Sequence, residues 1–374
     1  MTTVGIRWAD LTPHEDAGAV EAAIRRVLDR GWFVLGPEVD AFETEFAAST
    51  FATHTIAVAS GTDALTLILR GLGIGPGDEI ITTAVSAVFT AQAVMMAGAR
   101  PIFADIDPER LTLDPAVVAA LIGPRTAAIL PVHLYGQPAA LPALVALAER
   151  YGLALIEDCC QAHLATCAGV PVGTSGVAAA YSFYPTKNLG ALGDGGAVCT
   201  NDAQLAARVR QLRNGGQTAR DRHVEPASHS RLDELQAAVL RARLPYLRTW
   251  TARRRLLASR YREGFSDSVV RVPLEKDSGH VYHLFPIRVE GRDRLQAHLR
   301  LCQIDTLVHY PVPVPAQPVF ATASPGVCPV ADRVCKELLS VPLYPGLDDS
   351  AVSRVIEAVT SGRALALPIY PPSD

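Results

Sequence analysis

The sequence lacks the features that mark membrane, secreted and nucleic-acid-binding proteins. Its 374 residues include no uninterrupted apolar stretch of about 18, the length that spans a bilayer. The N-terminus "MTTVGIRWADLTPHEDAG" has neither the basic start nor the apolar run of a signal peptide. No basic run is present and the formal net charge is −4, which argues against nucleic acid or an anionic membrane as the main partner. We expect a globular cytoplasmic protein.

The cysteines also lack the pattern of a disulfide framework or a zinc site. The seven cysteines are an odd number without zinc-type spacing, so they fit reduced thiols better than a disulfide framework or a metal site. The adjacent Cys159 and Cys160 invite a metal or redox interpretation, but buried inert thiols explain them better. We therefore expect no metal.

Lysine is nearly absent, because only three of the 34 basic residues are lysines: Lys187, Lys276 and Lys336. Arginine is always charged, whereas a buried lysine can lose its proton and become a nucleophilic amine. Lys187 lies in the small, aromatic and glycine-rich stretch "AAAYSFYPTKNLGALGDGGAVCTND", residues 178–202. Lys187 is therefore a candidate for chemistry.

Short apolar strands alternate with helices from about residue 55 to 201, which is typical of an α/β unit with a mostly parallel sheet. The stretch "TIAVAS" predicts a strand, and "DALTLILRGLG" predicts a helix with leucine and isoleucine on one face. The stretches "LALIEDCC", "VAAAYSFY" and "GGAVCTND" predict further strands, the last two of which flank Lys187. We expect helices on both faces of this sheet.

The C-terminal third has a different pattern. A helix predicted over 230–244, "SRLDELQAAVLRARL", ends at Pro245. After it come a basic helix near "ARRRLLASRYREG", strands around "VYHLFPIRVEG" and the proline-rich loop "VHYPVPVPAQP". We predict a large domain over 1–245 and a smaller α+β domain over 246–374.

Three features suggest what Lys187 works with. The apolar run "LALIEDCCQAH" stops at Glu157 and Asp158, at the carboxyl end of a strand, where open α/β sheets bind ligands. Such a carboxylate can equally cap the next helix. The stretch "ASGTDAL" places Gly61 and Thr62 at a helix N-terminus, which can bind an anion but is also ordinary capping chemistry. Ser182, five residues before the lysine, offers another hydroxyl.

An amine, a buried carboxylate and a phosphate cradle are together the parts that pyridoxal 5'-phosphate requires. The amine forms a Schiff base with the cofactor aldehyde, and the phosphate anchor fixes the ring. A carboxylate at the pyridine nitrogen keeps that nitrogen protonated, so that the ring acts as an electron sink. Each role fits one residue type in this sequence.

Seven stretches in this order closely resemble the DegT/StrS-type nucleotide-sugar aminotransferases, within the fold type I (aspartate aminotransferase) superfamily. They are "SGTDAL", "GPGDEIIT", "AGARPIFADID", "PVHLYGQPA", "IEDCCQAH", "YSFYPTKNLGALGDGGAV" and "SRLDELQAAVL". The resemblance runs from about Gly36 to Pro345. It implies a homodimer with active sites at the subunit interface, Lys187 as the Schiff-base lysine and Asp158 on the pyridine nitrogen.

The resemblance also implies contacts for other residues. Gly61, Thr62 and Ser182 would hold the phosphate, and Gln161 would lie near the phenolic oxygen of the cofactor. Candidate substrate-binding residues are Tyr184, Asn188, His309 and Tyr310. For the "HYP" loop that contains the last two, solvent-exposed turn residues are the plain alternative.

The sequence departs from the family pattern at three positions. His229 stands where many members have an asparagine that reaches the phosphate from the partner subunit, and Leu164 stands in place of a glycine. Ala87 aligns with an aromatic residue that lies against one face of the cofactor ring. We expect extra room over the ring there, unless the alignment is off by two and Phe89 is the stacking residue. None of these changes touches Lys187, whose loss marks the dehydratase branch of the family.

The predicted function is transfer of an amino group, from L-glutamate, to a keto group of a nucleotide-linked deoxysugar. One alternative is a keto-cyclitol acceptor, as in aminoglycoside biosynthesis, because that branch shares the same cofactor residues. The other alternative is a regulatory protein that binds the cofactor without catalysis. The complete set of Asp158, Gln161, Ser182 and Lys187 favours the enzyme.

Overall fold

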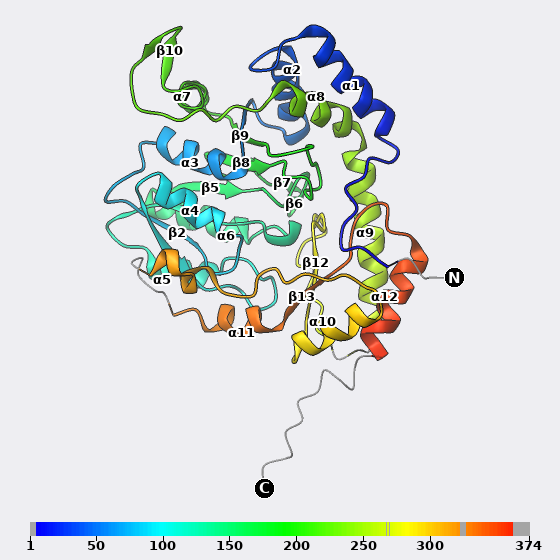
Figure 1. Ribbon diagram of the computed structural model, residues 1–374. Helices are drawn as coiled ribbons and strands as arrows, with labels where there is room; N and C mark the ends of the chain where they lie inside the picture. The colour runs from blue at the N-terminus through cyan, green and yellow to red at the C-terminus, as the bar shows by residue number, and fades with distance from the viewer. Residues whose placement is uncertain (1–4, 267, 269, 322–326, 362–374) are drawn as a thin grey trace.

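A seven-stranded sheet forms the centre of the computed structural model, which describes residues 5–266, 268, 270–321 and 327–361 (Figure 1). The strand order is β1-β9-β8-β5-β4-β2-β3. The strands are β1 (His54–Val58), β2 (Glu79–Thr83), β3 (Arg100–Ala104), β4 (Thr126–Leu130), β5 (Ala154–Asp158), β8 (Ala178–Ser182) and β9 (Gly196–Thr200). Only β9 runs against its neighbours β1 and β8, and the other pairs are parallel. The predicted mostly parallel sheet is confirmed.

Helices cover both faces of this sheet. One face is packed by α2 (Pro37–Thr50), α5 (Pro115–Leu121), α6 (Leu141–Tyr151) and α8 (Glu234–Arg243). The other is packed by α3 (Gly61–Gly71), α4 (Phe89–Met96) and α7 (Ala203–Leu212). Because side chains alternate along a strand, Ala179 and Tyr181 of β8 face the first group of helices, whereas Ala178 and Ala180 face the second. Both faces are therefore buried, as the apolar strand sequences predict.

The predicted helices differ from the observed ones mainly at their ends. The helix expected from residue 63 begins at Gly61, because Ser60 Oγ accepts a 3.1 Å hydrogen bond from the Asp63 amide and caps it. The helix expected over 230–244 is shorter, since α8 begins at Glu234. Pro245 lies in a single 3₁₀ turn, after which α9 (Leu247–Gly264) begins directly.

The C-terminal part contains its own apolar cluster. The elements of this C-terminal part are α9, β12 (Phe285–Arg288), α10 (Arg292–Leu301), α11 (Pro329–Glu337), β13 (Leu338–Val341) and α12 (Asp349–Ser361). β12 and β13 pair antiparallel, and residues of α9, α10 and α12 bury them together with Ile6 from the N-terminal segment. The division into domains at residue 245 stays a prediction.

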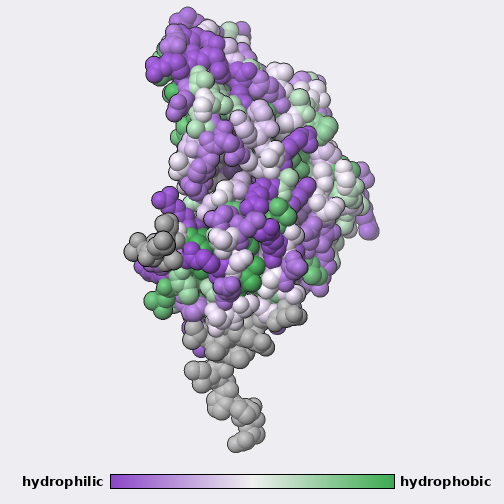
Figure 2. Space-filling view, turned by 90° about the vertical axis from the view of Figure 1, so that its right-hand side faces the viewer, coloured by the Kyte–Doolittle hydropathy of each residue, from purple (hydrophilic) through white to green (hydrophobic). Residues whose placement is uncertain are grey.

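The remaining elements lie at the periphery. α1 (Ala17–Arg30) packs on α8, and two short hairpins are formed by β6 (Thr166–Cys167) with β7 (Val170–Pro171) and by β10 (Gln217–Ala219) with β11 (Arg222–His223). On the face that carries α9 and α12, polar and apolar residues are intermixed (Figure 2). Within the described ranges, no helix combines the length and apolar character needed to cross a bilayer.

Candidate active site

Three chain segments meet at the carboxyl edge of the sheet. Asp158 and Ser182 are the last residues of the adjacent parallel strands β5 and β8. The first residue of α3, Gly61, packs closely against Ser182 and against Cys160, which follows β5: an added Cβ would lie 2.6 Å from Cys160 Sγ and 2.9 Å from Ser182 Cβ. Only glycine fits there without displacing its neighbours. The structure therefore brings together Gly61, Asp158 and Ser182, which the sequence predicted as one site.

The start of α3 presents unpaired backbone donors. The amide N–H groups of Gly61 and Thr62 donate to no other residue among those described, whereas the next amide, of Asp63, donates to Ser60. Thr62 and Ser182 are half-buried beside these amides. Free N–H groups at the N-terminus of an eleven-residue helix, with hydroxyls nearby, form a site for a phosphate. This part of the structure fits the phosphate of the predicted cofactor.

Asp158 is a buried carboxylate held by neutral donors. Its side chain is nearly inaccessible, with 3% relative exposure. Oδ2 accepts a 2.8 Å hydrogen bond from Thr90 Oγ1, and Oδ1 accepts a 3.0 Å bond from the Cys160 amide. Within the described residues no lysine or arginine forms an ion pair with it, so its charge is available to a cationic ligand. The alternative role as a helix cap is wrong, because residues 159–165 form turns and not a helix.

Lys187 lies half-buried in the loop between β8 and β9, and its backbone amide donates to Tyr184 O at 2.8 Å. Burial lowers the pKa of its amine, and the nearby Cys160 and Asp158 offset only part of this effect. No described residue accepts a hydrogen bond from Nζ. A desolvated amine with a lowered pKa is closer to the neutral, nucleophilic form that the sequence argument required.

The "HYP" loop from the C-terminal part is fastened to this edge. Gln161 Nε2 donates to Tyr310 Oη at 3.1 Å, while Gln161 Oε1 accepts from the Tyr135 amide at 2.7 Å. The Tyr135 hydroxyl in turn donates to His309 O. His309 and Tyr310 are both half-buried, so the alternative of a solvent-exposed turn is wrong. Burial raises the pKa of Tyr310 to about 12 and, with the charge of Lys187, lowers that of His309 to about 4.

A cavity of about 350 Å³ opens beside Lys187. Its walls come from the N-terminal segment, the loop around Lys187, α9 and the segment after β13, and they include Trp8, Lys187, Asn188, Arg254, Trp250 and Tyr344. Asn188 is buried, and its Nδ2 donates to Val281 O at 3.0 Å. Tyr184, at 51% exposure, does not line the cavity.

His229 was predicted to contact the phosphate, but within a single chain it lies away from the other residues of this site. Its exposed side chain lies near Gly215, and no contact joins it to the described residues Gly61, Thr62 or Ser182. The following residue, Ser230, is fully buried and donates to Asp63 Oδ2 at 2.8 Å. The backbone of this segment thus passes close to the start of α3.

Two site residues were missed by sequence reasoning. Thr90 contacts Asp158, yet a threonine in the first turn of a helix carries no signal of that contact. Cys160 is half-buried against Gly61, so the expectation of two buried thiols holds fully only for Cys159. Burial nevertheless raises the pKa of the Cys160 thiol well above its ordinary value, so the thiol is protonated at neutral pH.

Ala87 and Leu164, two of the residues that depart from the family pattern, lie in loops next to the site. Ala87 is half-buried in the loop that precedes α4, whereas Phe89 is the first residue of that helix and is 58% exposed. Leu164 has φ +63°, in the left-handed region where glycine is unstrained. This backbone conformation explains why a glycine suits the position that Leu164 occupies.

Known proteins resemble this chain over nearly its whole length. A transaminase from Streptomyces venezuelae, named dTDP-3-amino-3,4,6-trideoxy-alpha-D-glucose transaminase, is 48% identical over 91% of this chain and 90% of its own length. A crystal structure of S. venezuelae DesV in complex with a ketimine intermediate superposes with a TM-score of 0.94 at 45% identity, covering 98% of this chain and 100% of that one. The structure of NtdA from Bacillus subtilis, with bound cofactor PMP, has a TM-score of 0.89 at 30% identity, covering 96% and 85%.

The family model for these proteins covers almost all of the described chain. It matches residues 15–360, from the start of α1 to the end of α12. The mostly parallel sheet, the lysine loop and the carboxylate at the end of β5 are the parts of a pyridoxal-phosphate enzyme, and the residues present fit that cofactor. This chain belongs to the DegT/DnrJ/EryC1/StrS aminotransferase family.

Proposed function

We propose that this chain transfers an amino group from an amino acid, L-glutamate, to the keto group of a nucleotide-linked deoxysugar. The observation that carries the proposal is the position of Lys187, whose desolvated amine lies near Asp158 and also lines the 350 Å³ cavity. A group in that place can serve both the cofactor and a substrate. The name of the S. venezuelae relative, at 48% identity, supports a nucleotide-linked sugar as the acceptor.

The cofactor-holding roles follow from the contacts described above. When bound, pyridoxal phosphate supplies an aldehyde and a ring that withdraws electrons from the substrate carbon. The Asp158 carboxylate, which pairs with no cation among the described residues, would keep the ring nitrogen protonated. The free amides of Gly61 and Thr62, with the hydroxyls of Thr62 and Ser182, would hold the phosphate. Gln161, held between Tyr135 and Tyr310, would lie near the phenolic oxygen.

Lys187 then acts as the acid and base of the reaction. Because burial lowers the pKa of this amine, Nζ can accept a proton from the donor carbon in one half-reaction and deliver a proton to the acceptor carbon in the other. Asp158 and Gln161 are buried, which limits the access of water to this part of the site. Lys187 is the sole titratable side chain for which we propose this role.

The cavity suits substrates of the proposed kind. Its volume falls within the roughly 300–1,000 Å³ typical of small-molecule sites, and Trp8 and Trp250 provide aromatic surface for a nucleobase. Donor and acceptor must each bring a reacting atom to Lys187, so they occupy this space in turn. We therefore expect ping-pong kinetics.

We also propose a homodimer with the sites at its interface. Several large apolar side chains are exposed on one chain, namely Trp32 at 54%, Phe33 at 48%, Val34 at 40% and Phe89 at 58%. Exposed apolar residues of this size support burial against a second copy. His229 would then reach the phosphate of the partner subunit in place of the usual asparagine. The cytoplasmic location stays a prediction.

Stepwise assays separate this function from its alternatives. The purified protein, loaded with pyridoxal phosphate, should convert L-glutamate to 2-oxoglutarate in a single turnover, seen as a change in the absorbance of the cofactor. Keto sugars linked to dTDP or UDP, and a keto-inositol, are then added separately. We expect the nucleotide-linked sugars to restore the original spectrum. Restoration by the keto-inositol alone would identify a cyclitol enzyme, and no release of 2-oxoglutarate would leave a non-catalytic binding protein.

A further inference from the structure

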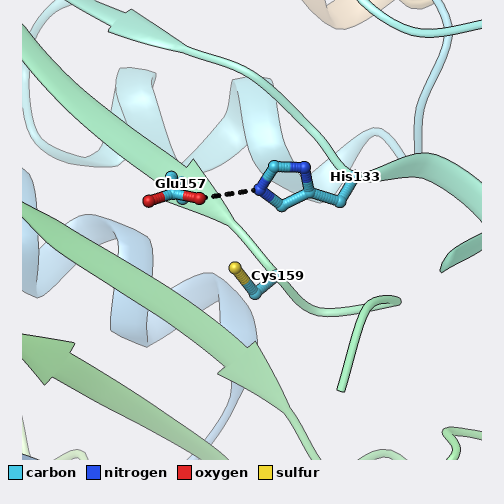
Figure 3. Close-up of side chains that lie close together, drawn as sticks. All are labelled: His133, Glu157 and Cys159. Atoms are coloured by element: carbon cyan, nitrogen blue, oxygen red, sulfur yellow. Dashed lines mark hydrogen bonds and ion pairs between the residues drawn. The ribbon is translucent and has the colours of Figure 1, made fainter. Parts of the chain in front are cut away.

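A second carboxylate stands beside Asp158 and belongs to a fully buried cluster. Glu157 precedes Asp158 on β5, and since side chains alternate along a strand, the two point to opposite faces of the sheet. Glu157 lies with His133 and Cys159, as Figure 3 shows, and all three have 0% exposure. Their ligand atoms are within 4.8 Å of one another, a separation that a metal ion can bridge.

Hydrogen bonds already occupy the groups that would bind a metal. Glu157 Oε1 accepts from the amides of Ser175 and Gly176, at 2.9 and 2.8 Å. Oε2 accepts from the Gly173 amide at 2.7 Å and from His133 Nε2 at 3.0 Å. His133 Nδ1 accepts from the Ala139 amide at 3.0 Å, so the ring proton lies on Nε2 and points at Glu157. The cluster is therefore a hydrogen-bond clamp.

Four donors around one carboxylate keep it ionised. Burial alone would raise the pKa of Glu157, but the hydrogen bonds from His133, Gly173 and Gly176 outweigh burial and hold this pKa below its ordinary value. A buried carboxylate with this many partners is costly to disturb, because removing it leaves several buried N–H groups without an acceptor.

The clamp reaches the two strands on either side of Asp158. In the sheet, β5 lies between β8 and β4. The segment 173–176 leads into β8 and packs so tightly on β5 that a Cβ at Gly176 would lie 2.4 Å from Leu155 O. On the other side, the backbone of Asp158 donates to Pro131 O at 2.9 Å and accepts from the His133 amide at 3.1 Å. The side chain of Glu157 thus bonds to segments on both sides of β5, residues 173–176 and His133, and Asp158 lies between them.

We propose that Glu157, through His133, is a positioning residue that fixes the Asp158 carboxylate where it meets the ring nitrogen of the cofactor. This inference rests on the proposed role of Asp158. It follows from the scarcity of other restraints. Among the described residues, only Thr90 and the Cys160 amide form hydrogen bonds to the Asp158 carboxylate, so its location depends on the backbone that the clamp holds.

A double-mutant cycle in the full-length protein tests the inference, with pyridoxal phosphate as the probe. We would measure the Kd of the cofactor by equilibrium dialysis and the absorbance of the bound cofactor for Glu157→Gln, Asp158→Asn and the double variant. Glutamine turns an NH₂ group toward two N–H donors. If Glu157 acts through Asp158, we expect Glu157→Gln to raise Kd about tenfold alone but less than twofold in the Asp158→Asn background.

Controls separate positioning from lost stability. Glu43→Gln removes another buried carboxylate, which accepts from the Ala57 amide and pairs with Arg213. It should lower the melting temperature without changing Kd. If Glu157→Gln does not fold, His133→Leu should raise Kd in the same manner, whereas His133→Gln, which keeps a donor and an acceptor, should retain wild-type binding.

Each outcome has a defined meaning. Equal effects of Glu157→Gln in both backgrounds, or a melting-temperature loss with unchanged Kd and spectrum, would overturn the positioning role alone. Wild-type Kd and spectrum in Asp158→Asn would overturn the proposed cofactor site, and the positioning role with it.

Discussion

Thr90 Oγ1 donates a 2.8 Å hydrogen bond to Asp158 Oδ2, which joins the first turn of α4 to the end of β5 at the carboxylate. Both side chains are buried, and Thr90 lies 3.3 Å from a second hydroxyl, that of Ser86. The loop that carries Ala87 is therefore anchored to the residue that we assign to the ring nitrogen. The contact orients Asp158 without adding charge.

Replacing Thr90 by valine keeps the shape and removes the donor. We expect Thr90→Val to lower kcat about tenfold and to weaken cofactor binding several-fold, because one lost hydrogen bond to a charged group is worth about 1.5–3 kcal/mol. Thr90→Ser, which retains the hydroxyl, should stay close to wild type. Steady-state kinetics beside cofactor titration provide the measurement. Equal losses in both variants would show that packing, and not the hydrogen bond, is what matters.

The assignment of Lys187 leads to a chemical prediction. Lys187→Ala and Lys187→Arg should fold normally and lose turnover by about 10³-fold or more, since neither offers an amine that can exchange protons. Borohydride treatment of the wild-type protein with pyridoxal phosphate should attach the cofactor to the peptide that contains Lys187. Mass spectrometry that finds the label on Lys276 or Lys336 instead would contradict the assignment.

The buried histidines predict how stability depends on pH. Burial, assisted by the charge of Lys187, lowers the pKa of His163 to about 3, whereas an unfolded chain has a histidine pKa of about 6.5. The unfolded state therefore binds more protons below pH 6.5. The resulting stability is complete above that pH and is lost as the pH falls toward 3, by up to about 1.4 kcal/mol per pH unit for each such histidine.

His163→Phe should reduce this sensitivity to acid. The ring of His163 lies among those of Phe46, Tyr181 and Phe183, so a phenyl ring fits the surroundings chemically. We expect the variant to be more stable than wild type at pH 5, and the difference to shrink at pH 8. Urea unfolding at both pH values measures it. A constant difference would show that protonation of His163 is not involved.

Ala87 gives a prediction about the cofactor ring. If the space beside Ala87 lies over the ring, Ala87→Phe should either tighten cofactor binding, by the roughly 0.5–1.5 kcal/mol of an aromatic contact, or raise the KM of the acceptor. Phe89→Ala should leave the Kd of the cofactor nearly unchanged. A large loss of affinity in Phe89→Ala, with no effect of Ala87→Phe, would place the stacking residue at Phe89.

The sheet and the ends of its strands were predictable because their signals are local. The apolar run before Asp158, the capping Ser60 and the glycine-rich loop after Lys187 each depend on neighbouring residues only. The start of α8 was less predictable, because Asp233 and Glu234 are both compatible with a helix. The Glu234 carboxylate accepts hydrogen bonds from the backbone amides of Gly36, Glu38 and Val39 at the start of α2, which is far away in sequence.

The contacts of the site that sequence did not reveal are long-range. Thr90 reaches Asp158 across 68 residues, and Gln161 reaches Tyr310 across 149. No periodicity or spacing encodes such pairs, because the sheet order that creates them arises only when the chain folds. For the same reason the contact between His133 and Glu157 could not be predicted from the sequence, although Glu157 was identified there as a carboxylate beside Asp158.

Leu164 combines a left-handed backbone with a large apolar side chain. A non-glycine residue in this conformation costs about 1–2 kcal/mol, but the leucine side chain packs against the apolar cluster beneath the sheet. Glycine removes the strain and also removes the packing, so the two contributions oppose each other. We therefore expect exchange between glycine and leucine to change the free energy of unfolding little. The fold fixes the backbone angle at position 164 but leaves two different side chains with similar free energies there.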